Sequence, residues 1–182
     1  MAVHDRRIHS GSSAGLSPQR RAPLYTPEQR RRRDATRWTL VQGLLAPAQF
    51  LAFLVSLALV LRTLATGQGL FAASLSVVVK TLFLYAIMVT GAIWEKRVFG
   101  RYLFAPAFYW EDVFSMLVIG LHTAYLVALG TGWLSARAQL GLALVAFFTY
   151  VINAGQFLLK LRAARLDEQG MSLHPPLQRV TP

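Results

Sequence analysis

Three acidic side chains lie near one another at the edges of long apolar segments. The stretch AIWEKRVFGRYLFAPAFYWEDVF, residues 92–114, contains Glu95, Glu111 and Asp112, whereas the other five of the eight acidic residues lie outside it. A carboxyl group at the boundary of an apolar medium loses hydration, which favours its protonated form. Such a group can hold a proton at cellular pH and transfer it to a bound molecule. The three acids are therefore candidates for general acid–base chemistry.

The same stretch also has ordinary explanations at the edge of a membrane. The acids could form ion pairs with Lys96, Arg97 or Arg101, which lie in the same connection. Trp94 and Trp110 fit the belt of aromatic residues found where membrane helices meet water. Both interpretations stay open from these residues alone.

The composition favours a membrane protein. Of the 182 residues, 54% are hydrophobic, which is too many for an ordinary soluble domain and enough for one compact membrane unit. Cysteine is absent, which excludes disulfides, thiolate nucleophiles and cysteine-ligated zinc or iron–sulfur sites.

The formal net charge of +11 is unevenly distributed, because nine of the nineteen basic residues precede Trp38. This arrangement indicates an anchor beside anionic lipid rather than a nucleic-acid-binding face. Within residues 1–37 we expect disorder up to Thr26-Pro27-Glu28, which resembles a helix start. A basic helix on the membrane surface and a solvated tail both remain open. The first apolar segment is too long for a signal-peptide core, so we expect it to stay in the membrane.

Four apolar segments follow, and each is about long enough to span ~30 Å of hydrocarbon. They cover residues 39–61, 70–94, 110–130 and 138–159. The sequence therefore predicts an all-α, multi-pass membrane protein with four transmembrane helices. Its parts are an N-terminal tail over 1–37, a transmembrane domain over 38–162 and a C-terminal tail over 163–182.

Polar side chains recur inside these segments, where each costs free energy unless it is satisfied. They include Lys80 near the middle of the second segment and the amides Gln42 and Gln49 in the first. On the fourth helix Asn153, Gln156 and Lys160 form a polar stripe at i, i+3, i+7, with Lys160 just after the apolar segment. We expect the amides to join helices through hydrogen bonds. For Lys80 we expect internal pairing or snorkelling rather than catalysis.

The third segment places polar residues on one helical face. Glu111, Ser115, Val118, His122 and Tyr125 follow a 4, 3, 4, 3 spacing, so this face is expected to point away from lipid. His122 is either a hydrogen-bonded interhelical histidine or a group that binds a ligand or transfers a proton.

Long parts of the sequence resemble the 3-vinyl (bacterio)chlorophyllide hydratases of bacteriochlorophyll biosynthesis. The resemblance lies in TRWTLVQGLLAPAQFLAFLVSLALVLRTLATG, in VINAGQFLLKLR and in KTLFLYAIMVTGAIWEKRVFGRYLFAPAFYWEDVFSMLVIGLHTAYL. It covers roughly residues 23–165 and runs through loops as well as helices. It implies a hydro-lyase that adds water to the 3-vinyl group of a chlorophyllide or bacteriochlorophyllide, giving a 3-(1-hydroxyethyl) group.

The resemblance also implies a setting for this chemistry. Hydration involves no redox change, so no cofactor is expected, and the magnesium ion is carried by the substrate macrocycle. The expected location is the bacterial inner membrane, either cytoplasmic or intracytoplasmic and photosynthetic. Expected partners are the pigment, membrane lipid and other enzymes of the pathway, with no nucleic acid.

Such a reaction needs an acid to protonate the terminal vinyl carbon and a base to accept a proton from the attacking water. Glu111 and Asp112 are the first candidates, followed by Glu95 and then His122. His122 could instead be an axial ligand of the substrate magnesium. Eleven residues of helix separate it from Glu111, a rise of ~16 Å, which weakens a joint role for the two.

The flat macrocycle and its propionate also need binding groups. Tyr102, Phe108 and Trp110 are candidates for stacking on the macrocycle. Arg97 or Arg101 could hold the propionate.

Three other functions compete with this interpretation. A bis-histidine haem protein needs two histidines inside the membrane, and only His122 lies in a predicted span. A proton-coupled exporter would need an acid in the middle of the membrane, where the sequence places Lys80. A non-catalytic pigment carrier or assembly factor could share the same pocket and the same resemblance, and this alternative stays open.

The basic residues predict the orientation of the chain. The five exposed segments carry 9, 1, 3, 1 and 4 basic residues in order, so both termini and the middle loop are expected in the cytoplasm. Cysteines introduced as Gly67→Cys and Thr131→Cys should then react with a membrane-impermeant thiol reagent from the periplasm. Labelling of either site from the cytoplasm would contradict this topology.

Overall fold

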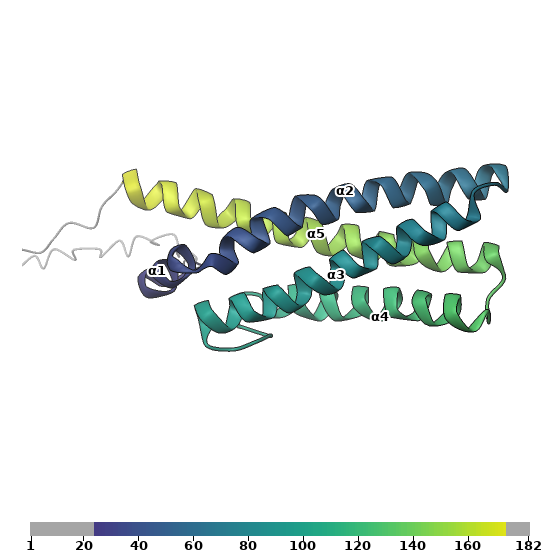
Figure 1. Ribbon diagram of the computed structural model, residues 1–182. Helices are drawn as coiled ribbons and strands as arrows, with labels where there is room; N and C mark the ends of the chain where they lie inside the picture. Colours follow the sequence, from purple (N-terminus) through teal and green to yellow (C-terminus); the bar gives the residue numbers. More distant parts are fainter. Residues whose placement is uncertain (1–23, 174–182) are drawn as a thin grey trace, which may run out of the picture.

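A computed structural model describes residues 24–173 as five helices, with no strand among these residues (Figure 1). The helices are α1 Pro27–Ala35, α2 Arg37–Thr66, α3 Leu70–Phe99, α4 Tyr109–Thr131 and α5 Ala136–Leu173. The last four are long and apolar enough to cross a membrane, which confirms the predicted all-α fold with four spans. The first part of the N-terminal tail, for which disorder was expected, lies outside the described residues.

The short helix α1 begins where the sequence indicated. Thr26 is the N-cap and Pro27 is the first helical residue. The Gln29 backbone N–H donates to Thr26 Oγ1 at 3.2 Å, and the Gln29 side chain accepts from the Thr26 N–H at 2.9 Å. This reciprocal capping satisfies two backbone donors that the helix itself leaves unpaired. The basic segment before the first span therefore includes a helix.

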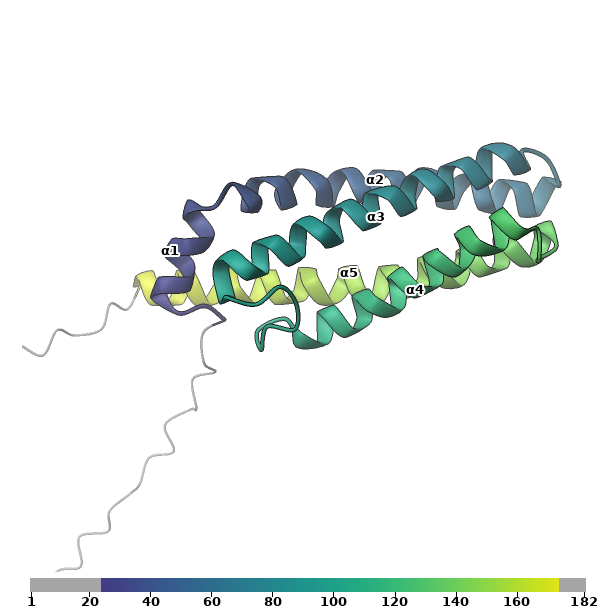
Figure 2. The same ribbon diagram turned by 60° about the horizontal axis from the view of Figure 1, so that its bottom comes forward.

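The four long helices form two hairpins, α2 with α3 and α4 with α5, that lie side by side (Figures 1 and 2). The first hairpin turns at Gly67, which has a φ of 71° and donates its N–H to the Thr63 carbonyl at 2.8 Å. A side chain would be strained in this left-handed conformation, so glycine is favoured there. Helix α1 and the C-terminal end of α5 lie at the same end of the bundle (Figure 1).

The outer surface of the bundle is apolar. Leu40, Phe71 and Phe148 are 67%, 81% and 68% exposed, respectively. Exposing apolar area to water costs ~25 cal/mol per Å². Hydrocarbon removes that cost, so this surface suits a protein surrounded by lipid.

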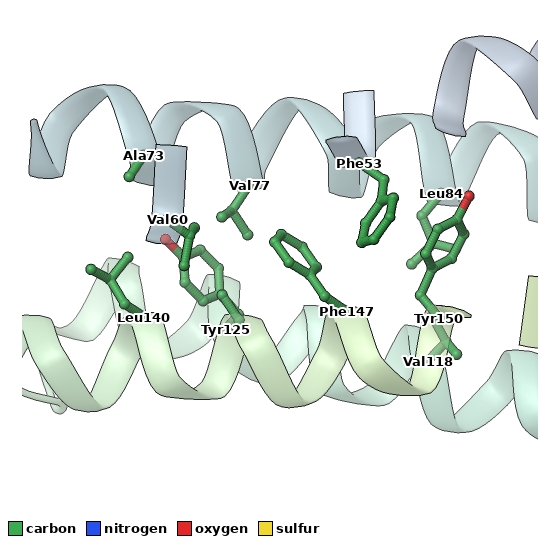
Figure 3. Packing of buried hydrophobic residues seen from close by; sticks show 11 residues of the cluster. Phe53, Val60, Ala73, Val77, Leu84, Val118, Tyr125, Leu140, Phe147 and Tyr150 are labelled. Atoms are coloured by element: carbon green, nitrogen blue, oxygen red, sulfur yellow. The ribbon is translucent and has the colours of Figure 1, made fainter. Parts of the chain in front are cut away.

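The main core lies between the two hairpins. Figure 3 shows Phe53 of α2, Val77 of α3 and Phe147 of α5 pointing into the same space. The Phe53 and Phe147 rings meet edge to face with centroids 5.5 Å apart, a favourable arrangement for aromatic pairs. All four long helices contribute to this core.

Two of the four amide side chains that were expected to join helices do so, whereas Gln49 and Gln156 form no such bond with the described residues and Gln156 Oε1 is buried without a partner. Gln42 Nε2 of α2 donates to Thr90 Oγ1 of α3 at 2.6 Å. Asn153 Nδ2 of α5 donates to Ser115 Oγ of α4 at 2.9 Å. The predicted inward face of α4 is also confirmed, because the five residues of that face are all buried: Glu111, Ser115, Val118, His122 and Tyr125.

Lys80 and His122 form a fully buried hydrogen bond between α3 and α4. Lys80 Nζ lies 2.7 Å from His122 Nε2, and both residues are 0% exposed. His122 Nδ1 lies 2.8 Å from the Val118 carbonyl oxygen, which can only accept, so Nδ1 is the donor there. Nε2 then accepts from Lys80, whose Nζ also lies 4.1 Å from the centroid of the Tyr150 ring. Internal pairing of Lys80, one of the two arrangements expected, is confirmed.

This pair should be strongly coupled in stability. His122→Leu would leave the buried Lys80 amino group without its hydrogen-bond acceptor, which costs about 1–3 kcal/mol for an unsatisfied polar group. In Lys80→Met/His122→Leu both polar groups are replaced by apolar ones, so most of the loss should be recovered. Unfolding of the purified variants by SDS titration would measure this. Additive losses in the double variant would contradict the coupling.

Candidate functional site

The three acids of the opening stretch come together at the end of the bundle where α3 ends and α4 begins. Glu95 lies in the last part of α3, and Glu111 and Asp112 lie in the first turn of α4. Their residues are only 6%, 7% and 3% exposed, respectively. These carboxyl groups are therefore enclosed by protein rather than displayed at the surface.

Glu111 is paired with a lysine from a distant part of the chain. Lys160 Nζ of α5 donates to Glu111 Oε2 at 2.6 Å and lies 5.0 Å from the centroid of the Phe108 ring. The sequence had placed Lys160 on a polar stripe of the fourth span without predicting its partner. Glu111 thus pairs with α5, and not with the basic residues of its own connection.

Asp112 and Glu95 are held by the backbone of the connecting loop. The Phe104 N–H donates to Asp112 Oδ2 at 2.6 Å, and the next N–H, of Ala105, donates to Glu95 Oε2 at 3.3 Å. The two carboxyl groups also lie within hydrogen-bonding reach of each other. Two consecutive amides therefore orient two facing acids, an arrangement that sequence spacing did not indicate.

Phe104 has an unusual backbone conformation at this point. Its φ of 58° is the one positive value among the described residues other than glycine. The left-handed region costs a residue with a side chain roughly 1–2 kcal/mol. Loop contacts hold the conformation, since the Phe108 N–H donates to the Ala105 carbonyl at 2.8 Å. The strain is located where the amides meet the acids.

An inner aromatic cluster packs behind the acids. It consists of Tyr25, Trp94, Phe99, Phe108 and Phe157. The Phe108 ring lies 5.8 Å from the ring of Trp94 and 5.9 Å from that of Phe157. Phe108, a predicted substrate-stacking residue, is only 2% exposed. In this arrangement it supports the site from inside, and stacking on a ligand would require the cluster to open.

An outer aromatic group lies on the exposed side of the same loop. It consists of Tyr102, Phe104, Tyr109 and Trp110, which are 61%, 38%, 47% and 67% exposed. The rings of Tyr109 and Trp110 meet edge to face at 5.5 Å, and the Phe104 ring lies 5.8 Å from that of Tyr109. The predicted stacking residues Tyr102 and Trp110 are thus accessible, and Phe104 joins this group to the acids.

The remaining predicted residues lie apart from the acids. Arg101 is exposed in the loop that carries the outer aromatic group. Arg97 is exposed on α3 and lines a recess with residues of α1 and α2. His122 lies farther along α4, where both ring nitrogens form hydrogen bonds, so coordination of a metal would require Lys80 or Val118 to release it.

The arrangement offers paired carboxyl groups, an ion pair and accessible aromatic rings at one end of a membrane bundle. It is suited to proton transfer to and from a flat molecule that approaches through lipid.

Comparison with known proteins identifies the family. The family model for 2-vinyl bacteriochlorophyllide hydratase matches residues 25–163. A protein of that name from Cereibacter sphaeroides is 70% identical over 151 residues, which cover 83% of this chain and 92% of the relative. Another from Rhodobacter capsulatus is 68% identical over 151 residues, covering 83% of this chain and 87% of the relative. No solved structure matches the chain. The chain therefore belongs to the 2-vinyl bacteriochlorophyllide hydratase family.

Proposed function

We propose that this protein is a hydratase that adds water across the vinyl group of a bacteriochlorophyllide or chlorophyllide. The names of both relatives support this reaction. The vinyl-bearing carbon that these names count as position 2 is position 3 in the numbering used above. The observation that carries the chemistry is the facing pair of buried carboxyl groups, Glu95 and Asp112, held by consecutive backbone amides.

The reaction converts –CH=CH₂ and H₂O into –CH(OH)–CH₃. An acid protonates the terminal carbon, which leaves positive charge on the inner carbon, where the macrocycle delocalises it. Water attacks that inner carbon, and a base accepts the spare proton. The reaction therefore needs two protein side chains beside the vinyl group, one protonated and one ionised.

Glu95 and Asp112 can supply both forms. A hydrogen bond between two carboxyl groups requires a proton on at least one of them, so we assign one proton to the pair. We assign proton donation to the protonated member of this pair. Its ionised member is assigned as the base that accepts the proton of the attacking water. Glu111 accepts from the Lys160 ammonium, as a carboxylate does. We therefore assign Glu111 to the ion pair that fixes the first turn of α4 against α5 rather than to donating the proton, although its sequence position had made it a first candidate.

The outer aromatic group is the proposed platform for the macrocycle. Its exposed rings offer apolar area for stacking beside Asp112. Arg101 in the same loop is the proposed partner of the propionate. Arg97 is a weaker candidate, because it lies two residues from Glu95 and so on a different face of α3.

No redox cofactor enters this proposal, because adding water changes no net oxidation state. The magnesium ion belongs to the substrate. His122 is assigned a structural role, since the hydrogen bond from Lys80 occupies His122 Nε2, the nitrogen that would otherwise coordinate the magnesium ion.

The acid-bearing end of the bundle is proposed to face the cytoplasm, in the inner membrane of a bacterium. The distribution of basic residues supports this orientation. Pigment would then arrive from the lipid and water from the cytoplasm. Other enzymes of the pathway are proposed partners.

Removing the transferable proton tests the assignment. Asp112→Asn or Glu95→Gln should insert and bind pigment but lose ~10²–10⁴-fold in turnover, the usual contribution of general acid–base catalysis. Turnover of the vinyl pigment by purified protein, with pigment binding followed by absorbance, measures both. It also separates a hydratase from a pigment carrier. Glu28→Gln is the control, because Glu28 is an exposed acid of α1 that pairs with Arg32. Near-normal turnover by both variants would refute the assignment.

The strained loop residue gives a second test. Phe104→Gly and Phe104→Val both remove the ring, but only glycine adopts the left-handed conformation without strain. The glycine variant should keep its amides directed at the acids and turn over at least tenfold faster than the valine variant. Only the valine variant should show an altered pH profile of turnover. Equal rates and profiles would show that the backbone conformation does not position the acids.

A further inference from the structure

An open recess of about 370 Å³ lies where α1, the start of α2 and the end of α3 meet. It is lined by Arg32, Ala35, Thr36, Arg37, Trp38 and Arg97. Three of these six residues are arginines, and each of the three helices contributes one of them. The recess is much larger than the ~30 Å³ that one water occupies in the liquid, so it has room for a polar headgroup.

The positive charge of the recess is only partly compensated. Arg32 forms an i,i+4 ion pair with Glu28 at 2.5 Å. Arg37 and Arg97 form no ion pair with any residue in 24–173. Two guanidinium groups of different helices therefore face one recess without an acidic partner in the described part of the chain. A planar guanidinium group suits bidentate recognition of phosphate or carboxylate.

The recess lies at the beginning of a spanning helix. Arg37 is the first residue of α2, and Thr36 forms no side-chain cap hydrogen bond. The partial positive charge of the helix start therefore adds to that of the arginines. Trp38 is half-buried beside them, and tryptophan is enriched at the depth where lipid headgroups lie. The ligand thus belongs at headgroup level.

The recess is distinct from the carboxyl site. Arg97 and Glu95 are two residues apart on α3, which rotates their side chains by about 200° around the helix. Glu95 is buried towards α4, whereas Arg97 is exposed towards α1. A macrocycle stacked on the outer aromatic group therefore approaches from another face.

We propose that this recess binds the phosphate headgroup of an anionic phospholipid. Arg37 and Arg97 hold the phosphate from two helices, and Trp38 packs beside the upper part of the lipid. The bound lipid joins α1 to the ends of α2 and α3. This inference does not depend on the proposed reaction.

Lipid retention by the purified full-length protein tests the proposal. Arg37→Gln/Arg97→Gln removes the two unpaired guanidinium groups, and Arg162→Gln/Arg165→Gln is the matched control. The control removes two exposed arginines near the C-terminal end of α5, which lies at the same end of the bundle as α1. Wild type and control should retain phosphatidylglycerol over phosphatidylcholine in native mass spectrometry. The recess variant should lose this lipid at least tenfold more readily, because hydrogen bonds to charged groups are the stronger kind.

Several outcomes would overturn the proposal. Unchanged phosphatidylglycerol retention by the recess variant would show that the recess is not the site. An equal loss in the control would show that general surface charge is responsible. Displacement of the lipid by millimolar inorganic phosphate would indicate a site for free anions. Unchanged lipid retention with a raised KM for the chlorophyllide would assign the arginines to the substrate propionate instead.

Discussion

The hydrogen bond between Lys80 and His122 is the contact on which the arrangement of the two hairpins depends. Among the described residues, Lys80 Nζ has no acid beside it, only an imidazole nitrogen and the face of an aromatic ring. In hydrocarbon such a group is costly unless it is satisfied, so α3 and α4 cannot rotate freely about their axes. The same two helices carry Glu95 and Asp112 to one end of the bundle. A structural pair in the interior thus determines which acids meet at the boundary.

Much of the fold could be predicted because the membrane penalises polar groups so strongly. The lengths of the apolar segments gave the four spans, and the spacing from Glu111 to Tyr125 gave the buried face of α4. The same penalty made interhelical bonds by Gln42 and Asn153 predictable. The site was less predictable. The spacing of apolar residues predicts helices but not the conformation of a loop. The sequence therefore did not indicate the conformation of Phe104 or the hydrogen bonds of the loop amides to the acids. Phe108 was expected to stack on the macrocycle, but packing against Trp94 and Phe157 buries it.

The boundary between lipid and water organises the remaining features. Inner aromatic residues fill the end of the bundle, whereas outer ones remain exposed beside the acids. Lys160 compensates Glu111 from α5, so one of the three buried acids is neutralised by the second hairpin. The basic recess lies at the same end of the molecule but on another face of α3. One end of the bundle therefore presents three separate surfaces: the exposed aromatic rings, the buried acids and the basic recess.

The near-equivalence of Glu95 and Asp112 has a consequence for the direction of the reaction. Each is a buried carboxyl group that accepts one backbone amide, and neither is bound to a lysine. In the proposed mechanism either member of the pair can hold the proton, so the pair serves the forward step and its reverse alike, because donor and acceptor exchange roles. Such a catalyst eliminates water from the alcohol by the same path. The yield of alcohol then depends on the local activity of water and on how quickly the product is withdrawn.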